Sequence, residues 1–258
     1  MRIDGKVVLI TGASEGIGAA CAAALRARGA RLSLVARSPE KLAAIGGPDA
    51  SITAGDVTLP ETRTEAVNAT IRRFGAIDIL INNAGMGSYD PSWNTPMADA
   101  RRLFELNLFA PLAMVQLVAP HMRARSSGVI VNVTSVAGKV TLPWLTLYSA
   151  SKSALGSLTD GLRMELKKDG IHTITLCPGY VKTNFHDHAL GGAPPPRISR
   201  GKRFAITPEQ CAEALARGIE RNARTVMAPP GSGWLFVLAE RLFPSLVDAQ
   251  LAAILHDV

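Results

Sequence analysis

Residues 6–18 read KVVLITGASEGIG, and this stretch decides how the rest of the chain folds. A run of β-branched and apolar residues enters a turn with three glycines, and the alanine-rich segment 18–29 follows. Glycine lets a turn pass close to an anion, and the N–H groups that open a helix favour negative charge. A turn alone would explain one glycine but not three. The pattern therefore predicts a dinucleotide site formed by Gly12, Ser14, Glu15, Gly16, Ile17 and Gly18.

The rest of the chain repeats this alternation of a short apolar run and a longer segment with helical period. Strand-like runs lie at 6–11, 31–36, 50–54, 76–82, 128–134, 171–177 and 224–229. Helical periods lie at 18–29, 38–45, 60–75 and 97–125, in the segment that carries Tyr148, and from Thr207-Pro208 onward. This order predicts one α/β domain over 1–258, with a doubly wound parallel sheet covered by helices on both faces. Such sheets bind ligands at the carboxyl ends of their strands.

The composition limits the classes of partner. The chain has 258 residues, 47% of them hydrophobic, which is enough to build one large core. The net charge is +7, but the 28 lysines and arginines are scattered, and only 5% of residues are aromatic. A nucleic-acid surface would need clustered basic residues with aromatic ones between them. We therefore expect no nucleic acid, and a charge bias that suits an anionic cofactor.

The cysteines and histidines do not form a metal-binding pattern. Cys21, Cys177 and Cys211 are far apart, and the five histidines have no acids or cysteines at ligand spacing. We therefore expect no metal, no disulfide framework and a cytoplasmic location. The N-terminal apolar run is too short for a signal peptide, and no transmembrane span is expected.

The end of the second predicted strand indicates which dinucleotide binds. In sheets that bind NAD, an acid near this point holds the ribose hydroxyls. Here the sequence reads Val35-Ala36-Arg37-Ser38. Arg37 can instead neutralise a 2′-phosphate, with Ser38 and Ser14 as further donors, which predicts NADP(H). A solvent-facing Arg37 is the plain alternative.

Residues 135–152, SVAGKVTLPWLTLYSASK, carry the candidate chemistry. Tyr148 and Lys152 are four residues apart and would share one face of a helix. A nearby ammonium favours the phenolate and lowers the pKa of a phenol, so that it can exchange a proton with an alcohol or carbonyl oxygen. Ser135 can supply a second hydrogen bond to that oxygen. Taken alone, the pair could equally be a surface tyrosine and a surface lysine.

With TGASEGIG at 11–18, NNAG at 82–85, YSASK at 148–152 and PG at 178–179 in this order, the chain resembles the short-chain dehydrogenases/reductases. The resemblance covers about residues 5–228. It implies a Rossmann-type sheet of about seven strands, a homodimer or homotetramer, and NADP(H)-dependent hydride transfer between C4 of the nicotinamide and a carbonyl or secondary alcohol.

The resemblance also implies roles for individual residues. Asn107 resembles the residue that holds a water in the proton relay, Ser135 orients the carbonyl, and Tyr148 is the acid/base. Lys152 is its partner and bonds the nicotinamide ribose together with Tyr148. Asn107 could instead cap a helix carbonyl, and Asp56 could be a turn former. The remaining implied cofactor contacts are Asp56 and Val57 at the adenine, Asn83, Ala84 and Gly85 beside its ribose, and Pro178, Gly179, Val181 and Thr183 at the carboxamide.

The substrate is less well defined. Residues 184–206 have no clear period and contain two adjacent glycines and three prolines, so we expect a substrate loop over the site. An apolar ketone or 3-oxoacyl group fits the candidate pocket residues. A steroid or other secondary alcohol oxidised by the enzyme is one alternative, and a non-catalytic NADP(H) sensor or scaffold is another. The candidate pocket residues are Met86, Tyr89, Trp93, Pro143, Trp144 and Leu145.

The C-terminal extension, residues 229–258, is unusually apolar. It predicts two amphipathic helices that cover the substrate cleft or a subunit interface. The alternative is contact with a membrane surface through residues 231–255. We favour the lid or interface, because the polar faces of these helices carry few basic residues.

Overall fold

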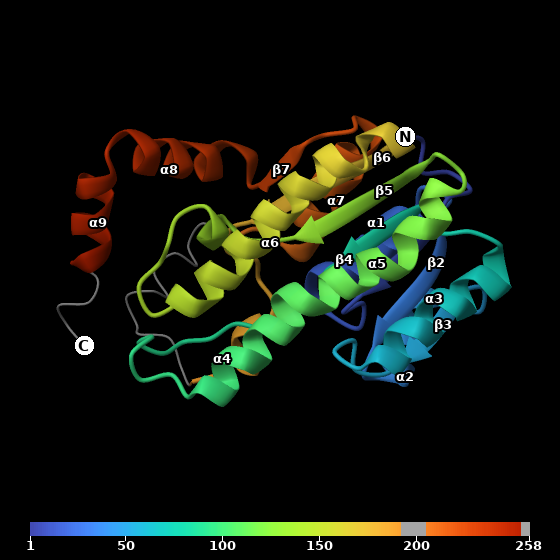
Figure 1. Ribbon diagram of the computed structural model, residues 1–258, viewed down its shortest axis with the longest axis horizontal. Coiled ribbons are helices and arrows are strands. Elements are labelled where there is room, and N and C mark those ends of the chain that lie inside the picture. The colour runs from blue at the N-terminus through green and yellow to red at the C-terminus, as the bar shows by residue number, and fades with distance from the viewer. Residues whose placement is uncertain (192–204, 254–258) are drawn as a thin grey trace.

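The computed structural model describes residues 1–191 and 205–253. All seven predicted strands form, and they join in one parallel sheet in the order β3-β2-β1-β4-β5-β6-β7 (Figure 1). The predicted doubly wound α/β fold is therefore confirmed. The strands are Val7–Thr11 (β1), Arg31–Ala36 (β2), Ser51–Ala54 (β3), Ile79–Asn82 (β4), Gly128–Val133 (β5), Ile171–Pro178 (β6) and Thr225–Ala228 (β7).

Helices cover both faces of this sheet (Figure 1). One face packs against α1 (Gly16–Arg26) and α7 (Pro208–Glu220), and α2 (Pro39–Gly46) adds Leu42 to the same core. The other face packs against α3 (Pro60–Phe74), α5 (Ala110–Arg123) and α6 (Thr146–Glu165). Because both faces are covered, β1, β4 and β5 are buried along their whole length, which explains their continuous apolar runs.

The predicted helix at 97–125 contains an irregular segment. Residues Met97–Phe104 (α4) and Ala110–Arg123 (α5) are α-helical, and Glu105–Phe109 (η1) between them is a π-helix. This 27-residue stretch is long and apolar enough to cross a membrane by length and composition. Its second half, however, packs on the sheet, where Met114, Val118 and Met122 are fully buried. Such a core helix passes the same test, so the finding is weak evidence for a membrane span.

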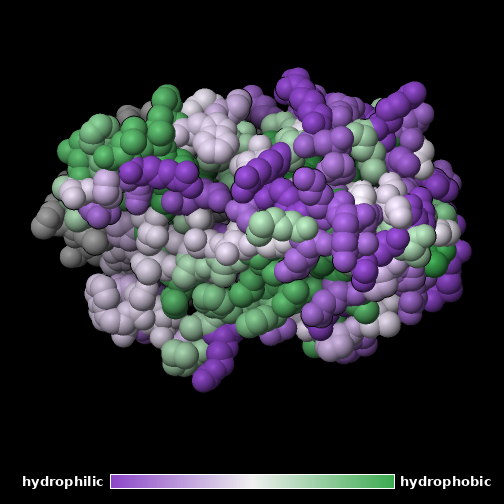
Figure 2. All heavy atoms as spheres, turned by 45° about the horizontal axis from the view of Figure 1, so that its top comes forward, coloured by the Kyte–Doolittle hydropathy of each residue, from purple (hydrophilic) through white to green (hydrophobic). Residues whose placement is uncertain are grey.

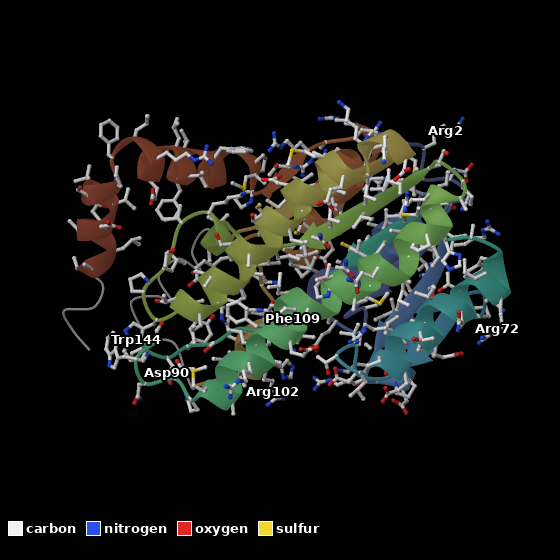
Figure 3. All side chains as sticks on the ribbon, viewed as in Figure 1. Arg2, Arg72, Asp90, Arg102, Phe109 and Trp144 are labelled. Atoms are coloured by element: carbon white, nitrogen blue, oxygen red, sulfur yellow. The ribbon has the colours of Figure 1, made fainter. Side chains whose placement is uncertain are left out.

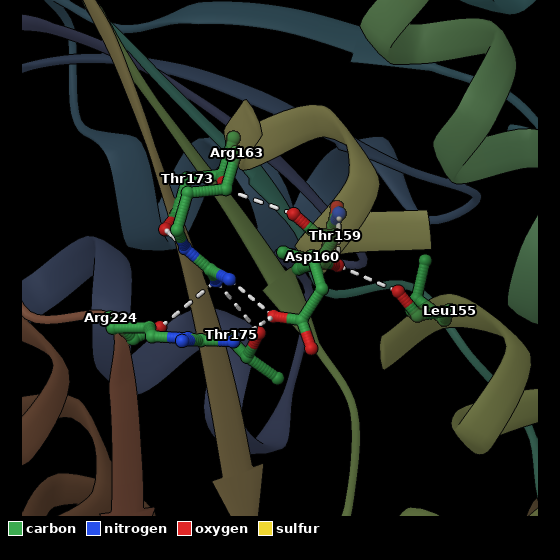
Figure 4. Close-up of polar contacts among 8 residues, drawn as sticks. Leu155, Thr159, Asp160, Arg163, Thr173, Thr175 and Arg224 are labelled. Atoms are coloured by element: carbon green, nitrogen blue, oxygen red, sulfur yellow. Dashed lines mark hydrogen bonds and ion pairs between the residues drawn. The ribbon is translucent and has the colours of Figure 1, made fainter. Parts of the chain in front are cut away.

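Helix α6, which carries Tyr148 and Lys152, is fixed to the sheet by polar contacts along its second half (Figure 4). The Arg163 guanidinium pairs with Asp160 and donates to the Thr173 carbonyl at 3.2 Å. The Thr159 hydroxyl accepts from the Asn132 amide at 2.9 Å, which ties the helix to β5. These bonds hold the axial position of α6, so the site residues about two to four turns earlier are placed by a rigid element.

The C-terminal part contains the predicted helices. Helix α7 begins with a capping box, in which Thr207 and Gln210 each bond the other's main-chain N–H. After β7 come α8 (Pro230–Leu242) and α9 (Pro244–Ala252), and together they extend from the body of the domain (Figure 1). We call these two helices the C-terminal arm. Residues 192–204 of the predicted substrate loop lie outside the described residues.

The crossing of β1 and α1 leaves no room for side chains at its glycines. A β carbon at Gly18 would lie 2.1 Å from the Gly12 carbonyl oxygen, and one at Gly12 would lie 2.8 Å from the Cα of Ala84. The Asn83 amide donates to the carbonyls of Thr11 and Gly12 at 3.0 Å each. The segments after β1 and β4 are therefore packed backbone to backbone.

We predict that Gly18→Ala lowers the free energy of unfolding by about 2 kcal/mol or more, because a main-chain oxygen has no alternative rotamer to relieve the clash. Urea unfolding followed by circular dichroism measures this. The matched control is Gly161→Ala in α6, where a β carbon meets nothing within 4 Å and should stabilise by about 0.5–1 kcal/mol. Equal stability of wild type and Gly18→Ala would contradict the packing described here.

Candidate active site

A cavity of about 1060 Å³ lies at the carboxyl ends of the strands. All of the predicted catalytic and cofactor-binding residues line it except Gly18, Ser38 and Asn107. Gly18 is buried under the glycine turn, Ser38 precedes α2, and Asn107 lies behind the cavity wall. The cavity therefore brings together Gly12, Ser14, Glu15, Gly16, Ile17, Arg37, Asp56, Val57, Asn83, Ala84, Gly85, Ser135, Tyr148, Lys152, Pro178, Gly179, Val181 and Thr183.

One end of the cavity fits a dinucleotide. Helix α1 points its N-terminus into it, and Gly12 and Gly16 have φ angles of 64° and 56°, which suit glycine. No acidic residue lies in the first turn of α1 to repel a phosphate. The adjacent Glu15 carboxylate is paired with Lys41 at 3.6 Å and with His188 at 3.2 Å. The donors and the shape suit a pyrophosphate.

Arg37 lies at the cavity where β2 ends, and its side chain is exposed. Within residues 1–191 and 205–253, no carboxylate forms an ion pair with it. A phosphate on the adenosine ribose could therefore reach its guanidinium. Asp56, predicted to contact the adenine, accepts from the main-chain N–H and hydroxyl of Thr58 at 2.9 and 2.8 Å. Asp56 therefore stabilises a turn, as in the alternative interpretation of its role, and it also lines the cavity.

Tyr148 lies deeper in the cavity and is only 8% exposed. Burial raises its pKa to about 12, and a hydrogen bond with Ser135 works in the opposite direction. Ser135 begins the short turn Val136–Gly138 (η2), where its hydroxyl accepts from the Ala137 N–H at 3.1 Å. The sequence predicted that Lys152 lowers the pKa of the Tyr148 phenol. In the folded protein, burial has the larger effect and raises that pKa. Tyr148 is consequently a protonated donor at neutral pH.

Lys152 lies behind Tyr148 and is 4% exposed. Its ammonium donates to the Val133 carbonyl at 2.9 Å and is 5.9 Å from the centroid of the Tyr148 ring. Burial lowers its pKa from 10.5 to about 8. Gly85 makes this position possible, since a β carbon there would lie 3.1 Å from the Lys152 nitrogen. The predicted pair is therefore assembled on one side of α6, facing the carboxyl ends of β4 and β5.

Asn107 lies in the π-helix η1 and is fully buried. Its amide nitrogen donates to the Met86 carbonyl at 2.9 Å and to the Ser151 hydroxyl at 3.1 Å, and its oxygen accepts from the Met86 N–H at 3.0 Å. Both amide hydrogens are therefore used. The side chain fixes the segment after β4 against α6, as π-helical residues at functional sites often do. Its predicted role in a water relay stays a prediction.

A strap formed by residues 180–190 crosses the cavity beside Tyr148. The Phe185 ring lies edge-on to Tyr148 at 5.7 Å between centroids. His186 bonds the Tyr89 hydroxyl, and the Tyr89 and Leu190 main chains are bonded at 2.9 Å. The sequence did not reveal this contact, because Tyr89 and His186 are far apart in the chain and meet only in the folded structure.

Two predicted pocket residues lie elsewhere. Trp93 is 90% exposed and, like Trp144, does not line the cavity. Trp144 has a φ angle of 65°, and its carbonyl accepts from the Asp90 N–H at 3.1 Å, so the two lie side by side at the rim (Figure 3). The turn directs Leu145 into the cavity instead. The sequence also missed Arg102 and Leu106 of the 97–109 segment and Phe236 and Leu251 of the arm, which line the cavity.

Metal-ligand groups were searched within the described ranges, with the gap at 192–204. No group of three or more histidine, cysteine or acidic side chains there could hold a metal ion. The three cysteines are buried and unpaired with one another. The cavity lining includes the phenol of Tyr148, the hydroxyl of Ser135 and the ammonium of Lys152.

Comparison with known proteins gives consistent matches. The short chain dehydrogenase family model matches residues 6–190. Dehydrogenase/reductase SDR family member 7B of Danio rerio is 37% identical over 203 residues, which are 74% of this chain and 66%, just under two thirds, of that protein. The 11-beta-hydroxysteroid dehydrogenase-like 2 protein of Arabidopsis thaliana is 34% identical to this chain. The match covers 97% of this chain and 82% of that protein.

Solved structures agree with the fold. A short chain dehydrogenase from Burkholderia cenocepacia in complex with NADP superposes with a TM-score of 0.83 at 28% sequence identity. The match covers 97% of this chain and 99% of that chain. A short chain dehydrogenase/reductase from Burkholderia phymatum in complex with NAD gives 0.84, at 26% identity over 95% and 96%. Similar folds thus hold both dinucleotides.

We predict that the lowered pKa of Lys152 makes its contribution to stability rise with pH. Between about pH 8 and 10 the unfolded chain keeps this proton while the folded chain has released it, so rising pH favours folding. The free energy of unfolding of wild type minus that of Lys152→Met should increase by about 2 kcal/mol over this range. Urea unfolding at pH 7.5, 9 and 10 measures it. The exposed Lys168→Met is the control, and a flat difference for Lys152 would contradict the lowered pKa.

Proposed function

Since the chain belongs to the short-chain dehydrogenase family, we propose that it is an NADP(H)-dependent oxidoreductase that interconverts an apolar ketone or 3-oxoacyl group and the corresponding secondary alcohol. The observation that carries this proposal is the arrangement of Tyr148, Ser135 and Lys152 at the deep end of a cavity whose other end suits a dinucleotide. A non-catalytic binding module would have no need for this set of groups.

Each side chain has a distinct task. Ser135 and the Tyr148 hydroxyl hold the carbonyl oxygen of the substrate, which orients the carbonyl carbon toward the nicotinamide end. Tyr148 delivers the proton as negative charge develops on that oxygen. Lys152 supports the phenolate that remains, because an ammonium close to it opposes the cost of a buried charge. When bound, the nicotinamide dinucleotide supplies or accepts the hydride.

The preference for NADP(H) rests on Arg37. Its exposed guanidinium lies at the cavity, and the residue before it, Ala36, offers no carboxylate to hold ribose hydroxyls. Of the two structures compared above, one holds NADP and one holds NAD, so the fold itself does not decide between them. The charge at the end of β2 supports NADP(H).

The substrate side of the cavity supports an apolar compound. Met86, Leu142, Leu145 and Phe185 contribute side chains to the wall around Tyr148. The name of the Arabidopsis relative, a hydroxysteroid dehydrogenase-like protein, is compatible with a steroid or another bulky secondary alcohol. We further propose a homodimer or homotetramer, which the family resemblance implies, and a cytoplasmic location, which the widely spaced cysteines favour.

We predict that Tyr148→Phe lowers kcat for ketone reduction by about 10²–10⁴-fold, because the phenyl ring keeps the shape of the site but has no proton to donate. The Kd for NADPH, measured by fluorescence titration, should change less than about threefold. Tyr89→Phe is the matched comparison, since it removes a buried hydroxyl from the same cavity. A larger loss in Tyr89→Phe than in Tyr148→Phe would mean that the wrong tyrosine has been assigned.

We predict that Arg37→Ala lowers kcat/KM with NADPH by about 10–100-fold, because charge-assisted bonds to a phosphate are lost. The value with NADH should stay nearly constant, since NADH carries no 2′-phosphate. Steady-state rates with both cofactors measure this ratio. The control is Arg31→Ala at the opposite end of β2, which should leave both values unchanged. Wild-type preference for NADH would refute the assignment.

A further inference from the structure

The C-terminal arm has two apolar faces that point in different directions. One side of α8 lines the cavity with Ser232, Gly233 and Phe236, which are spaced to share one face of a helix. Leu251 of α9 also lines the cavity. The opposite face is exposed, and Figure 2 shows apolar residues gathered over this end of the molecule. The exposed residues are Trp234, Leu235, Leu238, Leu242, Phe243 and Leu246, each at least 50% accessible.

The side of the arm that lines the cavity, which we call its inner face, lies next to the residue that follows Ser135. Val136 follows Ser135 in the chain, and a β carbon at Gly233 would lie 3.7 Å from its Cγ2 atom. Val136, Phe236 and Leu251 pack around the same buried cluster, which contains Val237. Apolar side chains therefore lead from Val136, beside Ser135, to Leu251 of α9, with Ser232 and Gln250 as polar residues on the same side of the arm.

The strap and the segment after β4 form another wall, which mixes apolar residues such as Met86 and Phe185 with polar ones. The strap and the segment after β4 place Tyr89, Tyr180 and His186 there, each with a polar atom at the end of its ring. On the arm, Phe236 and Leu251 are apolar, and Ser232 and Gln250 are its polar side chains among the described residues. A hydrocarbon chain that leaves the carbonyl is thus better accommodated toward the arm than toward the strap.

We propose that the inner face of the arm is a subsite for the hydrocarbon chain of an elongated aliphatic ketone, and that Phe236 and Leu251 determine how much of that chain is bound. The matched family model ends at residue 190, so the arm lies outside the segment that this model matches. The subsite rests on the proposed function, since it orients a substrate whose carbonyl lies at Tyr148. Each methylene that the arm buries should raise kcat/KM by up to about fourfold.

The test uses 2-butanone, 2-octanone and 2-undecanone with NADPH and the full-length protein. In wild type, kcat/KM should rise steeply with chain length. Phe236→Ala and Leu251→Ser should each lower the ratio of the 2-undecanone to the 2-butanone value by about 10-fold. The readout for these two variants is this ratio, and not the 2-butanone value alone. Leu251→Ser is included because α9 buries no side chain completely, so this change does not threaten the fold.

The matched controls lie on the exposed face of α8. Leu235→Ala and Leu238→Ala remove similar apolar groups that are 69% and 51% exposed, and they should keep the wild-type dependence on chain length. An equal loss of that dependence in these variants would overturn the proposal, because it would show that the arm acts through its stability and not through its inner face.

A binding measurement separates the subsite from the reaction. Isothermal titration calorimetry of 2-undecanone should give a Kd about 10-fold weaker for Phe236→Ala than for wild type, whether or not the ketone is reduced. Wild-type binding without turnover would refute the proposed reductase but keep the subsite. Turnover with the same Kd and the same chain-length dependence in wild type, Phe236→Ala and Leu251→Ser would overturn the subsite and keep the reductase.

Discussion

The burial of one ammonium group is the constraint on which the site depends. Lys152 is 4% exposed, and its ammonium donates to a main-chain carbonyl, that of Val133. Removing such a charge from water is costly, and burial accordingly lowers its pKa to about 8. The close approach of the neighbouring backbone, made possible by Gly85 and Gly138, keeps the group in place. Gly85 lies in the segment after β4, and Gly138 ends η2, which follows β5.

The same helix connects this group to the rest of the fold. Toward its C-terminal end, α6 is bonded to β5 and β6 through Asn132, Thr159 and Arg163. Toward its N-terminal end it presents Tyr148 to Ser135. A one-turn slip of α6 would break the bonds at one end and displace the phenol at the other. The precision of the site is therefore a property of the sheet and its hydrogen bonds, and less of the loops around the cavity.

The sequence predicted the strands, the glycine turn and the cavity positions of most site residues, because these depend on local patterns: apolar runs, glycine spacing and four ordered motifs. It did not reveal features that arise from contacts distant in the chain. The π-helical segment at Asn107, the bond between Tyr89 and His186, and the outward position of Trp93 are of this kind. The raised pKa of Tyr148 was also missed, since a spacing of four residues contains no information about burial.

The two perturbed pKa values have a joint consequence for the proton transfer of the proposed reaction. With its pKa at about 12, Tyr148 keeps its proton throughout the physiological range, and Lys152 is charged below about pH 8. A phenol of this strength still protonates an alkoxide, which is about as basic as hydroxide, whose conjugate acid has a pKa of about 15.7. Reduction leaves the phenolate behind and oxidation starts from it, so both directions of the proposed reaction involve a charge that burial disfavours. The ammonium of Lys152, when charged, stabilises this phenolate, and its protonation state therefore bears on both directions alike.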